Sequence, residues 1–344
     1  MKTVALMNDC SVPIHKVVVF ASGGYAYPTI SMLLEQQKLA GVVLPDVTEY
    51  ALNTGEIIAL ARQLQAASVP VVFCKKEQLA CLSEQLSLWR AEIALIVSFP
   101  YLLPVKIFQT LPWGAVNVHG SPLPAYRGPA PLYWQIRNSE VASALVLHCA
   151  EEKVDSGAIL LRHDIEIDPN DTVQCLSNKM AHASAQLISD FLSGIDSEGK
   201  LPEKKEQPVV HEHSKLPGKS YARRPGPEEN HIHFTSMTAL EISALCRASN
   251  AQPNGAWCHI HKVPIHVMQA MPVERQHYGV EPATILAIGE AEGLVVSTLE
   301  GALRLDILAC ADGVFSGFTF AERFQLDVGM TLSSVSSQTL NLET

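Results

Sequence analysis

The residues with the most specific chemistry in this sequence are Asn117 and His119, which lie two positions apart at the end of an apolar run. An extended strand directs alternate side chains to one face, so a strand from Ala115 to His119 presents the Asn117 amide and the His119 imidazole together. Such a pair combines a donor for a developing oxyanion with a titratable ring. The turn-rich segment 120–128 that follows is predicted to leave this strand end open to a substrate.

A carboxylate that can serve this pair lies downstream, in Asp155-Ser156-Gly157. This segment is predicted to form a loop between two strands, from which Asp155 can hydrogen-bond the His119 imidazole. A histidine that is oriented and made more basic by a carboxylate accepts a proton near neutral pH. A lone histidine beside an apolar strand is more often structural, so the complete set of three residues is what favours catalysis.

The elements that must position these residues follow a regular alternation. Strands are predicted over 17–21, 40–44, 69–73, 93–97, 115–119, 144–149 and 158–167. Helices are predicted over 27–38, 55–66 and 77–89, and from about 171 to 191. This order predicts βαβ units and an α/β fold with a Rossmann-like, mostly parallel sheet and flanking helices.

The composition changes after Gly194. Residues 196–227 are rich in Lys, Glu, Pro, Gly and Ser and are predicted to form a linker. Beyond it we expect a strand at 231–234, a helix at 238–248, and strands at 256–261, 263–269, 284–290, 293–297 and 301–309. The prediction is a catalytic domain over 1–195, a linker over 196–227 and a small β-rich, OB-like barrel domain over 228–344.

Composition limits the class of protein. The chain has 344 residues, of which 47% are hydrophobic and 17% charged, as in a well-packed soluble protein. No apolar stretch is long enough to cross a bilayer, and the first residues do not form a secretory signal, so we predict a cytoplasmic protein without a membrane partner. Eight cysteines without a C-x-x-C pair fit reduced thiols. A net charge of -10 does not favour nucleic-acid binding.

Two features suggest other cofactors but fit them poorly. Ser22-Gly23-Gly24 follows the first predicted strand, yet neither dinucleotide nor P-loop spacing is present, so we expect a turn that lines the active cleft. Strand alternation explains the pairs of histidines at i and i+2, which lack the ligand spacing of a structural zinc site. We therefore predict no metal. The residues of this second feature are His211, His213, His231, His233, His259, His261 and Cys258.

Together these motifs resemble the formyltransferase family that uses 10-formyltetrahydrofolate, whose members act on methionyl-tRNA, glycinamide ribonucleotide or amino sugars. The resemblance rests on Asn117–Pro124, Tyr126–Gly128 and Asp155–Gly157, and extends upstream to Ile96–Pro104 and Phe20–Gly24. It covers most of residues 17–200, and the second domain resembles the C-terminal module of the longer members.

The resemblance implies an N-formyltransferase that uses 10-formyltetrahydrofolate as co-substrate and no metal. It implies that Asn117 and protonated His119 stabilise an oxyanion, while Asp155 raises the basicity of His119. The folate is expected against Ser98, Phe99, Pro100, Tyr101, Leu102, Leu103 and Val154. The acceptor is expected near Ser22, Gly23, Gly24, Ser121, Arg127 and Gly128.

The nature of the amine acceptor depends on charge. The tRNA-modifying members carry a basic loop after the second strand, whereas the equivalent stretch here, 45–56, has no Lys or Arg. Segments 127–131 and 221–225 resemble the UDP-amino-arabinose formyltransferase domain more than the tRNA enzymes. The sequence therefore favours a small-molecule amine, such as a nucleotide-linked amino sugar. From residue 228 on, the basic residues are Arg247, Lys262, Arg275, Arg304 and Arg323.

Three alternatives stay open. The chain can be a methionyl-tRNA formyltransferase, although tRNA is the less favoured partner. It can be a hydrolase that passes the formyl group to water, or a non-catalytic interaction protein on the same fold. The sequence is compatible with a homo-oligomer and does not fix the oligomeric state.

Overall fold

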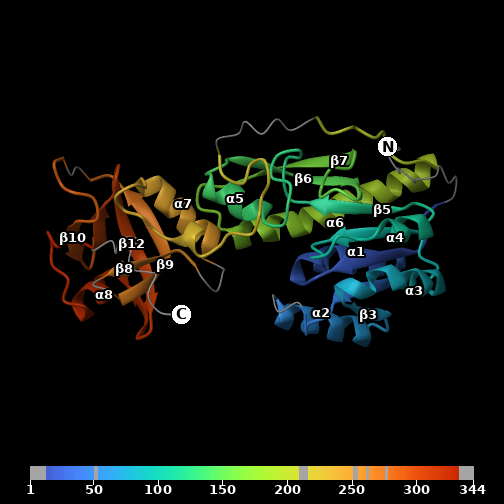
Figure 1. Ribbon diagram of the computed structural model, residues 1–344, viewed down its shortest axis with the longest axis horizontal. Helices are drawn as coiled ribbons and strands as arrows, with labels where there is room; N and C mark the ends of the chain where they lie inside the picture. Colours follow the sequence, from blue (N-terminus) through green and yellow to red (C-terminus); the bar gives the residue numbers. More distant parts are fainter. Residues whose placement is uncertain are drawn as a thin grey trace. The chain divides into compact units, whose positions relative to one another are not determined.

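The computed structural model describes residues 13–49, 53–208, 216–250, 255–260, 263–275 and 278–332 (Figure 1). Its contacts divide the chain into two compact units. Within the described ranges, the first unit takes residues up to 131, 142–166 and 176–223, and the second takes 132–141, 167–175 and the chain from 224 onward. The domain and linker boundaries given above stay a prediction.

The first unit is built on a seven-stranded sheet. Its strands are β1 (Val17–Ala21), β2 (Leu39–Pro45), β3 (Val71–Cys74), β4 (Ile93–Val97), β5 (Ala115–His119), β6 (Ala142–Cys149) and β7 (Ile159–Glu166). The order across the sheet is β3-β2-β1-β4-β5-β6-β7. The first five strands are mutually parallel, and β6 and β7 add to the edge in antiparallel fashion. The predicted mostly parallel sheet is confirmed.

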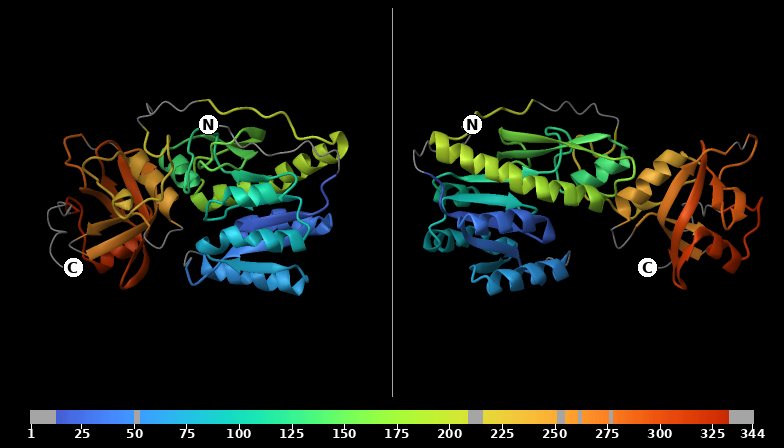
Figure 2. Two further views of the ribbon diagram at one scale, coloured as in Figure 1. Left: turned by 45° about the vertical axis from the view of Figure 1, so that its right-hand side comes forward. Right: turned by 180° about the vertical axis from the view of Figure 1, so that it is seen from behind.

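Helices connect the parallel strands of this sheet, and one long helix follows its last strand. They are η1 (Gly24–Ala26), α1 (Tyr27–Glu35), α2 (Thr54–Ala66), η2 (Lys76–Cys81), α3 (Leu82–Leu88), α4 (Val105–Thr110) and α6 (Val173–Glu198). Leu86 of α3 and Ile107 of α4 share one apolar core with Phe20 of β1. The hydroxyls of Thr29 in α1 and Ser184 in α6 lie 3.0 Å apart. The right-hand view of Figure 2, taken from behind, shows the long α6 crossing the sheet.

The strand order places the centre of the sheet where ligands bind in doubly wound folds. β2 and β3 lie on one side of β1, and β4 and β5 lie on the other side. The order in which strands are added to the sheet therefore reverses at β1. The crevice beyond the carboxyl ends of the strands at such a point is the usual ligand site. Ser22 follows β1 and its hydroxyl donates to the carbonyl of Ser98, which follows β4. The end of β5, with His119, lies next in the same row.

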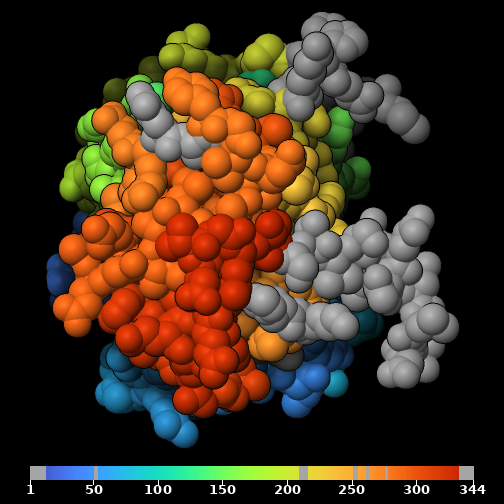
Figure 3. Space-filling model, turned by 90° about the vertical axis from the view of Figure 1, so that its left-hand side faces the viewer, coloured from blue at the N-terminus to red at the C-terminus, as the bar shows by residue number. Residues whose placement is uncertain are grey.

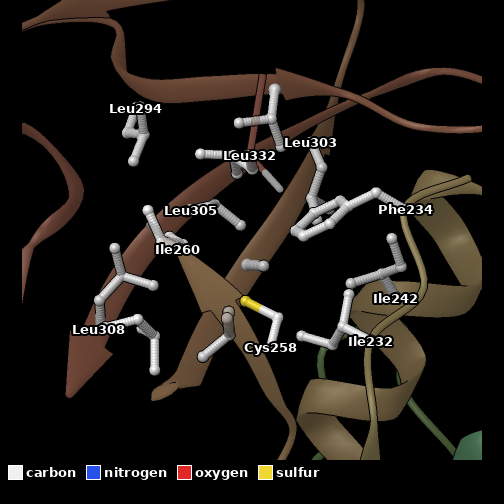
Figure 4. Packing of buried hydrophobic residues seen from close by; sticks show 14 of the residues in the cluster. Ile232, Phe234, Ile242, Cys258, Ile260, Leu294, Leu303, Leu305, Leu308 and Leu332 are labelled. Carbon is white, nitrogen blue, oxygen red and sulfur yellow. The ribbon is translucent and has the colours of Figure 1, made fainter. Parts of the chain in front are cut away.

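The second unit is, in its described part, a small β structure with three α-helices, the first of which is α5 (Pro131–Arg137), taken by this unit from Leu132 on. It contains η3 (Glu228–Asn230), α7 (Ala239–Ser249), β8 (Trp257–Ile260), β9 (Val263–Val273), β10 (Ile285–Gly289), β11 (Gly293–Ser297), β12 (Ala302–Cys310), β13 (Gly313–Ser316) and α8 (Gly317–Arg323). The antiparallel sheet has the order β10-β11-β12-β9-β8, and β13 pairs with β12. Phe234, Ile242 and Leu305 meet in its core (Figure 4). The outer surface of this unit, in orange and red, appears in Figure 3. The predicted β-rich second domain is confirmed.

The predicted strand at 231–234 is wrong. His231 makes a single bridge to Trp257, and the chain then turns through Thr235 and Ser236. The turn is needed because Thr238 begins α7: its hydroxyl accepts from the Glu241 N–H, and the Glu241 carboxylate accepts from the Thr238 N–H. Helix capping therefore overrides the alternating pattern of apolar residues.

Two findings concern the predictions made from composition, on membrane-spanning helices and on cysteines. None of the helices within the described ranges is both long and apolar enough to cross a lipid bilayer. The cysteines of the described chain are free thiols at positions 74, 81, 149, 175, 246, 258 and 310, while Cys10 lies outside it. The cytoplasmic location stays a prediction.

Packing of a tryptophan on β2 gives a test of the first unit. A Cβ at Gly41 would lie 2.7 Å from the Trp89 ring, so Gly41→Ala must displace that ring. We expect a loss of about 1–3 kcal/mol in the free energy of unfolding, measured by urea-induced unfolding. Gly194→Ala in α6 is the matched control, because nothing lies within 4 Å of its added Cβ. The control should gain about 0.5–1 kcal/mol. Equal effects of the two variants would contradict this packing.

Candidate active site

The site lies at the end of β5, where two neighbouring strands and two loops meet. Asn117 and His119 lie on β5, and Asp155 lies in the turn between β6 and β7. The Asp155 carboxylate contacts both: Asn117 Nδ2 donates to Oδ1 at 3.1 Å, and His119 Nδ1 lies 3.5 Å from Oδ2. The structure thus brings the three residues together around one carboxylate.

The Asp155 carboxylate also accepts a backbone hydrogen bond. The Gly128 N–H donates to Oδ2 at 2.8 Å, from the turn-rich segment after β5. The side chains of Asp155 and His119 are 11% and 7% exposed, so these bonds form largely out of water. A buried carboxylate without such partners would be unfavourable. The charge of Asp155 is therefore held by the groups that surround it.

The turn that carries Asp155 has a constrained backbone. Asp155 has a φ of 47°, in the left-handed region that side chains rarely adopt. A Cβ at Gly157 would lie 1.9 Å from the Cys149 carbonyl oxygen, so only glycine fits against the end of β6. These two features bend the chain sharply and return Asp155 toward β5.

His148 is a site residue that the sequence reasoning missed. It lies on β6 in register with Asn117, and it is 2% exposed. Its Nε2 lies 3.1 Å from Asn117 Nδ2 and 3.5 Å from Asp155 Oδ1. Its Nδ1 must donate to the Cys149 carbonyl at 2.9 Å, so in the neutral ring Nε2 accepts from Asn117. Alternation along β6 predicts which side chains share a face with His148. Only the pairing of β6 with β5 places His148 beside Asn117.

His119 is buried with its ring held on both sides. Its Nε2 lies 2.9 Å from the Tyr126 carbonyl oxygen, which can only accept, so Nε2 carries the proton of the neutral ring. Burial lowers the pKa of His119, and the Asp155 carboxylate opposes that effect. A further proton taken up by His119 would bind Nδ1, next to Asp155.

The pKa of Asp155 lies well below its ordinary value. Burial alone would raise its pKa, but the positive charge that His119 and His148 carry when protonated, together with the Gly128 N–H, favours the charged form and lowers the pKa to about 2. The site therefore combines a carboxylate that is ionised at neutral pH with a titratable ring.

Four of the residues predicted to hold the folate, three after β4 and one in the turn before Asp155, keep some surface free. Ser98 is exposed with a φ of 59°, and Leu102 is 56% exposed. Pro100 and Val154 are half-buried. An exposed leucine beside polar strand ends is a surface on which an aromatic ring system can pack.

The other three predicted folate residues face the core to a greater degree. The Phe99 ring packs edge to face on Phe20 and on Tyr101, with ring centroids 5.3 and 5.5 Å apart. Leu103 is 5% exposed and belongs to the core beneath the sheet. Leu103 thus shapes this loop from below and does not offer a surface to a ligand.

The predicted acceptor residues after β1 are already engaged. Ser22 is buried and bonded to the Ser98 loop, and the Gly24 N–H donates to the Glu56 carboxylate at 2.9 Å. Glu56 thereby places a negative charge against the Gly23–Gly24 turn. An anionic group of an acceptor would have to displace Glu56 to use that amide.

The predicted acceptor residues after β5 divide into two kinds. Ser121 is fully buried and its hydroxyl donates to the Ala125 carbonyl at 2.7 Å, so it stabilises the loop from within. Arg127 is half-buried and donates through Nε to Gln207 at 3.1 Å. Gly128 holds Asp155, as described above. Of these residues, Arg127 alone brings a charge to the site.

The histidines considered for a metal lie in the second unit or outside the described chain. His231 Nδ1 and His233 Nε2 lie 3.0 Å apart, and Trp257 packs on His231. Within the described chain, no group of three His, Cys, Asp or Glu side chains is arranged to hold a metal ion. His211, His213 and His261 lie outside the described residues. An open concavity of about 730 Å³ lies wholly in the second unit, and it presents no base paired with a nucleophile. Its lining is Val273, Glu274, Arg275, Tyr278, Leu299, Glu300 and Gly301.

Comparison with known protein families matches both parts of the chain. The family model described as formyl transferase matches residues 16–192, which is more than half of the chain. The model described as the formyl transferase C-terminal domain matches residues 226–314.

Curated relatives are named methionyl-tRNA formyltransferase. That of Synechococcus elongatus is 28% identical over 341 residues, covering 92% of this chain and 99% of its own length. That of Pseudothermotoga lettingae is 31% identical over 210 residues, covering 61% of this chain and 65% of its own length.

Solved structures share the fold at low identity. The N-formyltransferase from Helicobacter canadensis, in complex with folinic acid and dTDP-3-aminofucose, has a TM-score of 0.58 and 19% identity, covering 87% of this chain and 99% of that one. HypX from Aquifex aeolicus, in complex with tetrahydrofolic acid, has a TM-score of 0.58 and 14% identity. That match covers 91% of this chain, which spans about half of HypX (48%).

The pKa of Asp155 predicts how stability depends on pH. Its folded pKa of about 2 lies below the ordinary 3.8, so its stabilising effect is full above pH 4 and is lost as pH falls through this window. Between pH 6 and pH 3 the stability advantage of the wild type over Asp155→Asn should shrink by about 1 kcal/mol, measured by urea unfolding. Asp164→Asn is the control, because that carboxylate is 78% exposed. A constant difference between wild type and Asp155→Asn would show that Asp155 is not held as an anion.

Proposed function

Because the chain belongs to the formyl transferase family, and so transfers formyl groups, we propose that Asn117, His119 and Asp155 carry this reaction onto a primary amine. The formyl donor is 10-formyltetrahydrofolate. The observation that supports the assignment is the convergence of Asn117 and His119 on the buried Asp155 carboxylate at the carboxyl edge of the sheet.

The reaction requires one bond to form and one to break. The amine nitrogen attacks the formyl carbon, whose oxygen becomes an oxyanion in the tetrahedral intermediate. The bond from that carbon to N10 of the folate then breaks. The amine loses one proton and N10 gains one, so a group that accepts and returns a proton supports both steps.

The chain's own residues match these needs. His119 takes the amine proton at Nδ1, where the Asp155 carboxylate stabilises the imidazolium that forms. Asn117 donates to the oxyanion. Both hydrogens of Asn117 Nδ2 are engaged in the structure, one by Asp155 and one by His148, so this role requires that one of them changes partner. Such exchange on substrate binding is usual for catalytic hydrogen bonds.

The first candidate for the acceptor is the amino group of methionyl-tRNA. The support is the name of relatives that align with 92% of this chain and 99% of their own length, including the second domain. This support is better than that for the small amine which the charge pattern favours.

The second candidate is a small amine, and a specific observation favours it. Segment 45–56 has no basic residue, and its described carboxylates are engaged locally: Asp46 by Thr48, Glu49 by Lys75 and Glu56 by Gly24. A tRNA grip rests on several Lys or Arg contacts to phosphates. The fold is shared with an N-formyltransferase solved with a nucleotide-linked amino sugar.

The three proposed catalytic residues can be tested directly. We expect Asn117→Ala, His119→Ala and Asp155→Ala each to lower kcat by ~10²-fold or more, because each removes an oxyanion donor or a proton-transfer group. The measurement is release of tetrahydrofolate in the presence of the amine. His163→Ala is the matched control, because His163 is exposed on β7. Near wild-type rates for all three variants would refute the assigned roles.

The acceptor can be identified in one comparative assay. Wild-type protein is given 10-formyltetrahydrofolate with charged initiator tRNA, with UDP- and dTDP-linked amino sugars, or with no amine. Formylation of methionyl-tRNA whose rate falls steeply with salt would support the first candidate, because phosphate contacts are screened. Formylation of an amino sugar alone would support the second. Rapid formate release without any amine would instead indicate a hydrolase.

A further inference from the structure

Gln207 lies in the segment that the sequence predicts to be a linker, yet it contacts the loop of Asp155. Two residues before it, Lys205 pairs with Ile159 at the start of β7 through backbone bonds of 2.8 and 2.9 Å. This pairing lays the chain along the edge of the sheet in the first unit. Gln207 is half-buried and reaches the turn between β6 and β7.

The amide of Gln207 uses both its nitrogen and its oxygen. Its Nε2 donates to the carbonyl of Asp155 at 3.0 Å and to that of Gly157 at 2.8 Å. Its Oε1 accepts from Arg127, from Nε at 3.1 Å and from Nη2 at 2.5 Å. One side chain thus joins the loop of Asp155 to the loop of Arg127.

These bonds complete a ring. Arg127 is followed by Gly128, whose N–H donates to the Asp155 carboxylate at 2.8 Å. The loop of Arg127 and Gly128 therefore holds the Asp155 carboxylate, and Gln207 holds the Asp155 carbonyl. Gln207 also accepts from Arg127, so it fixes this loop as well. The left-handed φ of Asp155 persists only where surrounding contacts determine it, and Gln207 supplies contacts on both sides of Ser156.

We propose that Gln207 is a positioning residue for formyl transfer, which sets the direction of the Asp155 carboxylate toward His119 and holds the Arg127 guanidinium beside it. This inference rests on the proposed function, because it assumes that the reaction uses Asp155 and His119. Gln207 touches neither reacting atoms nor the carboxylate itself. It acts through the backbone of Asp155.

The chemistry of the amide defines a set of variants. Gln207→Glu keeps an acceptor for Arg127 but loses both donors to the carbonyls. Gln207→Met keeps the approximate length and loses donor and acceptor. Gln207→Ala removes the side chain. Gln186→Ala is the matched control, because Gln186 is exposed on α6 and bonds only Asp190 of the next turn in the described structure.

The kinetic test separates turnover from binding. We expect all three Gln207 variants to lower kcat by ~10-fold or more with the KM for 10-formyltetrahydrofolate unchanged, because a small displacement of a catalytic group slows the chemical step. The control should keep the wild-type kcat. A wild-type kcat in Gln207→Glu would overturn the proposal, since that variant lacks the two donors that hold Asp155. Circular dichroism and thermal unfolding of each variant identify losses that come from unfolding.

A second readout does not depend on activity. The pKa of His119 is measured by NMR titration of its ring signals, assigned by their absence in His119→Ala. Asp155 raises this pKa, so a displaced carboxylate in Gln207→Met or Gln207→Ala should lower the titration midpoint relative to the wild type. A midpoint equal to that of the wild type in folded Gln207→Met would overturn the proposal.

The outcomes distinguish the inference from the function on which it rests. If the wild type forms no formylated amine but the Gln207 variants lower the pKa of His119, the proposed function fails and the link between Gln207 and Asp155 holds. If the wild type is active and the variants match it in kcat and in the His119 midpoint, the proposed function stands and Gln207 has no positioning role.

Discussion

The constraint on which the site depends is the burial of one ionised carboxylate. Asp155 is largely removed from water; Asn117 Nδ2 and the Gly128 N–H donate to its carboxylate, and His119 and His148 lie 3.5 Å from it, where they stabilise its charge when protonated. The fall of its pKa from 3.8 to about 2 corresponds to about 2 kcal/mol of preference for the charged form. Strand β5, strand β6 and the loop after β5 each contribute a partner, so three segments of the first unit meet at this carboxylate.

Local pattern was sufficient to predict what lies within one strand. Asn117 and His119 share a face because alternation is a property of β5 alone, and the predicted bounds of β1, β4 and β5 agree with the structure. His148 could not be found in this way. Its role arises because β6 turns back to pair with β5 and places it opposite Asn117, and that register depends on the whole sheet. Pairing between strands is a non-local property that no single stretch of sequence contains.

The segment 196–227 shows a second limit of sequence analysis, because its composition predicts less structure than its described parts have. Its composition of Lys, Glu, Pro and Gly predicts a linker, because such residues bury little apolar surface. In the structure its described parts hold the site through backbone and amide bonds: Lys205 pairs with Ile159, Gln207 holds Asp155, and the Ala222 N–H donates to the Arg127 carbonyl. These contacts need no hydrophobic pattern, so composition cannot reveal them. Polar segments that bind through the backbone are the part of a fold that sequence patterns describe least.

Chemistry and acceptor choice are governed by different parts of this molecule. In the proposed reaction the residues around Asp155 act on a formyl carbon and an amine proton, which are the same whether the amine belongs to a tRNA or to a small sugar. Selection of the acceptor must therefore depend on the protein surface beyond Asn117, His119 and Asp155, where the electrostatic field of the whole chain acts. A net charge of -10 weakens attraction to a polyanion at long range, but contact with a phosphate depends on the groups nearest to it. Arg127, held by Gln207, brings a positive charge to the loop beside Asp155. The charge of the chain and the names of its relatives thus favour different acceptors because they reflect different properties, the field at long range in one case and descent in the other.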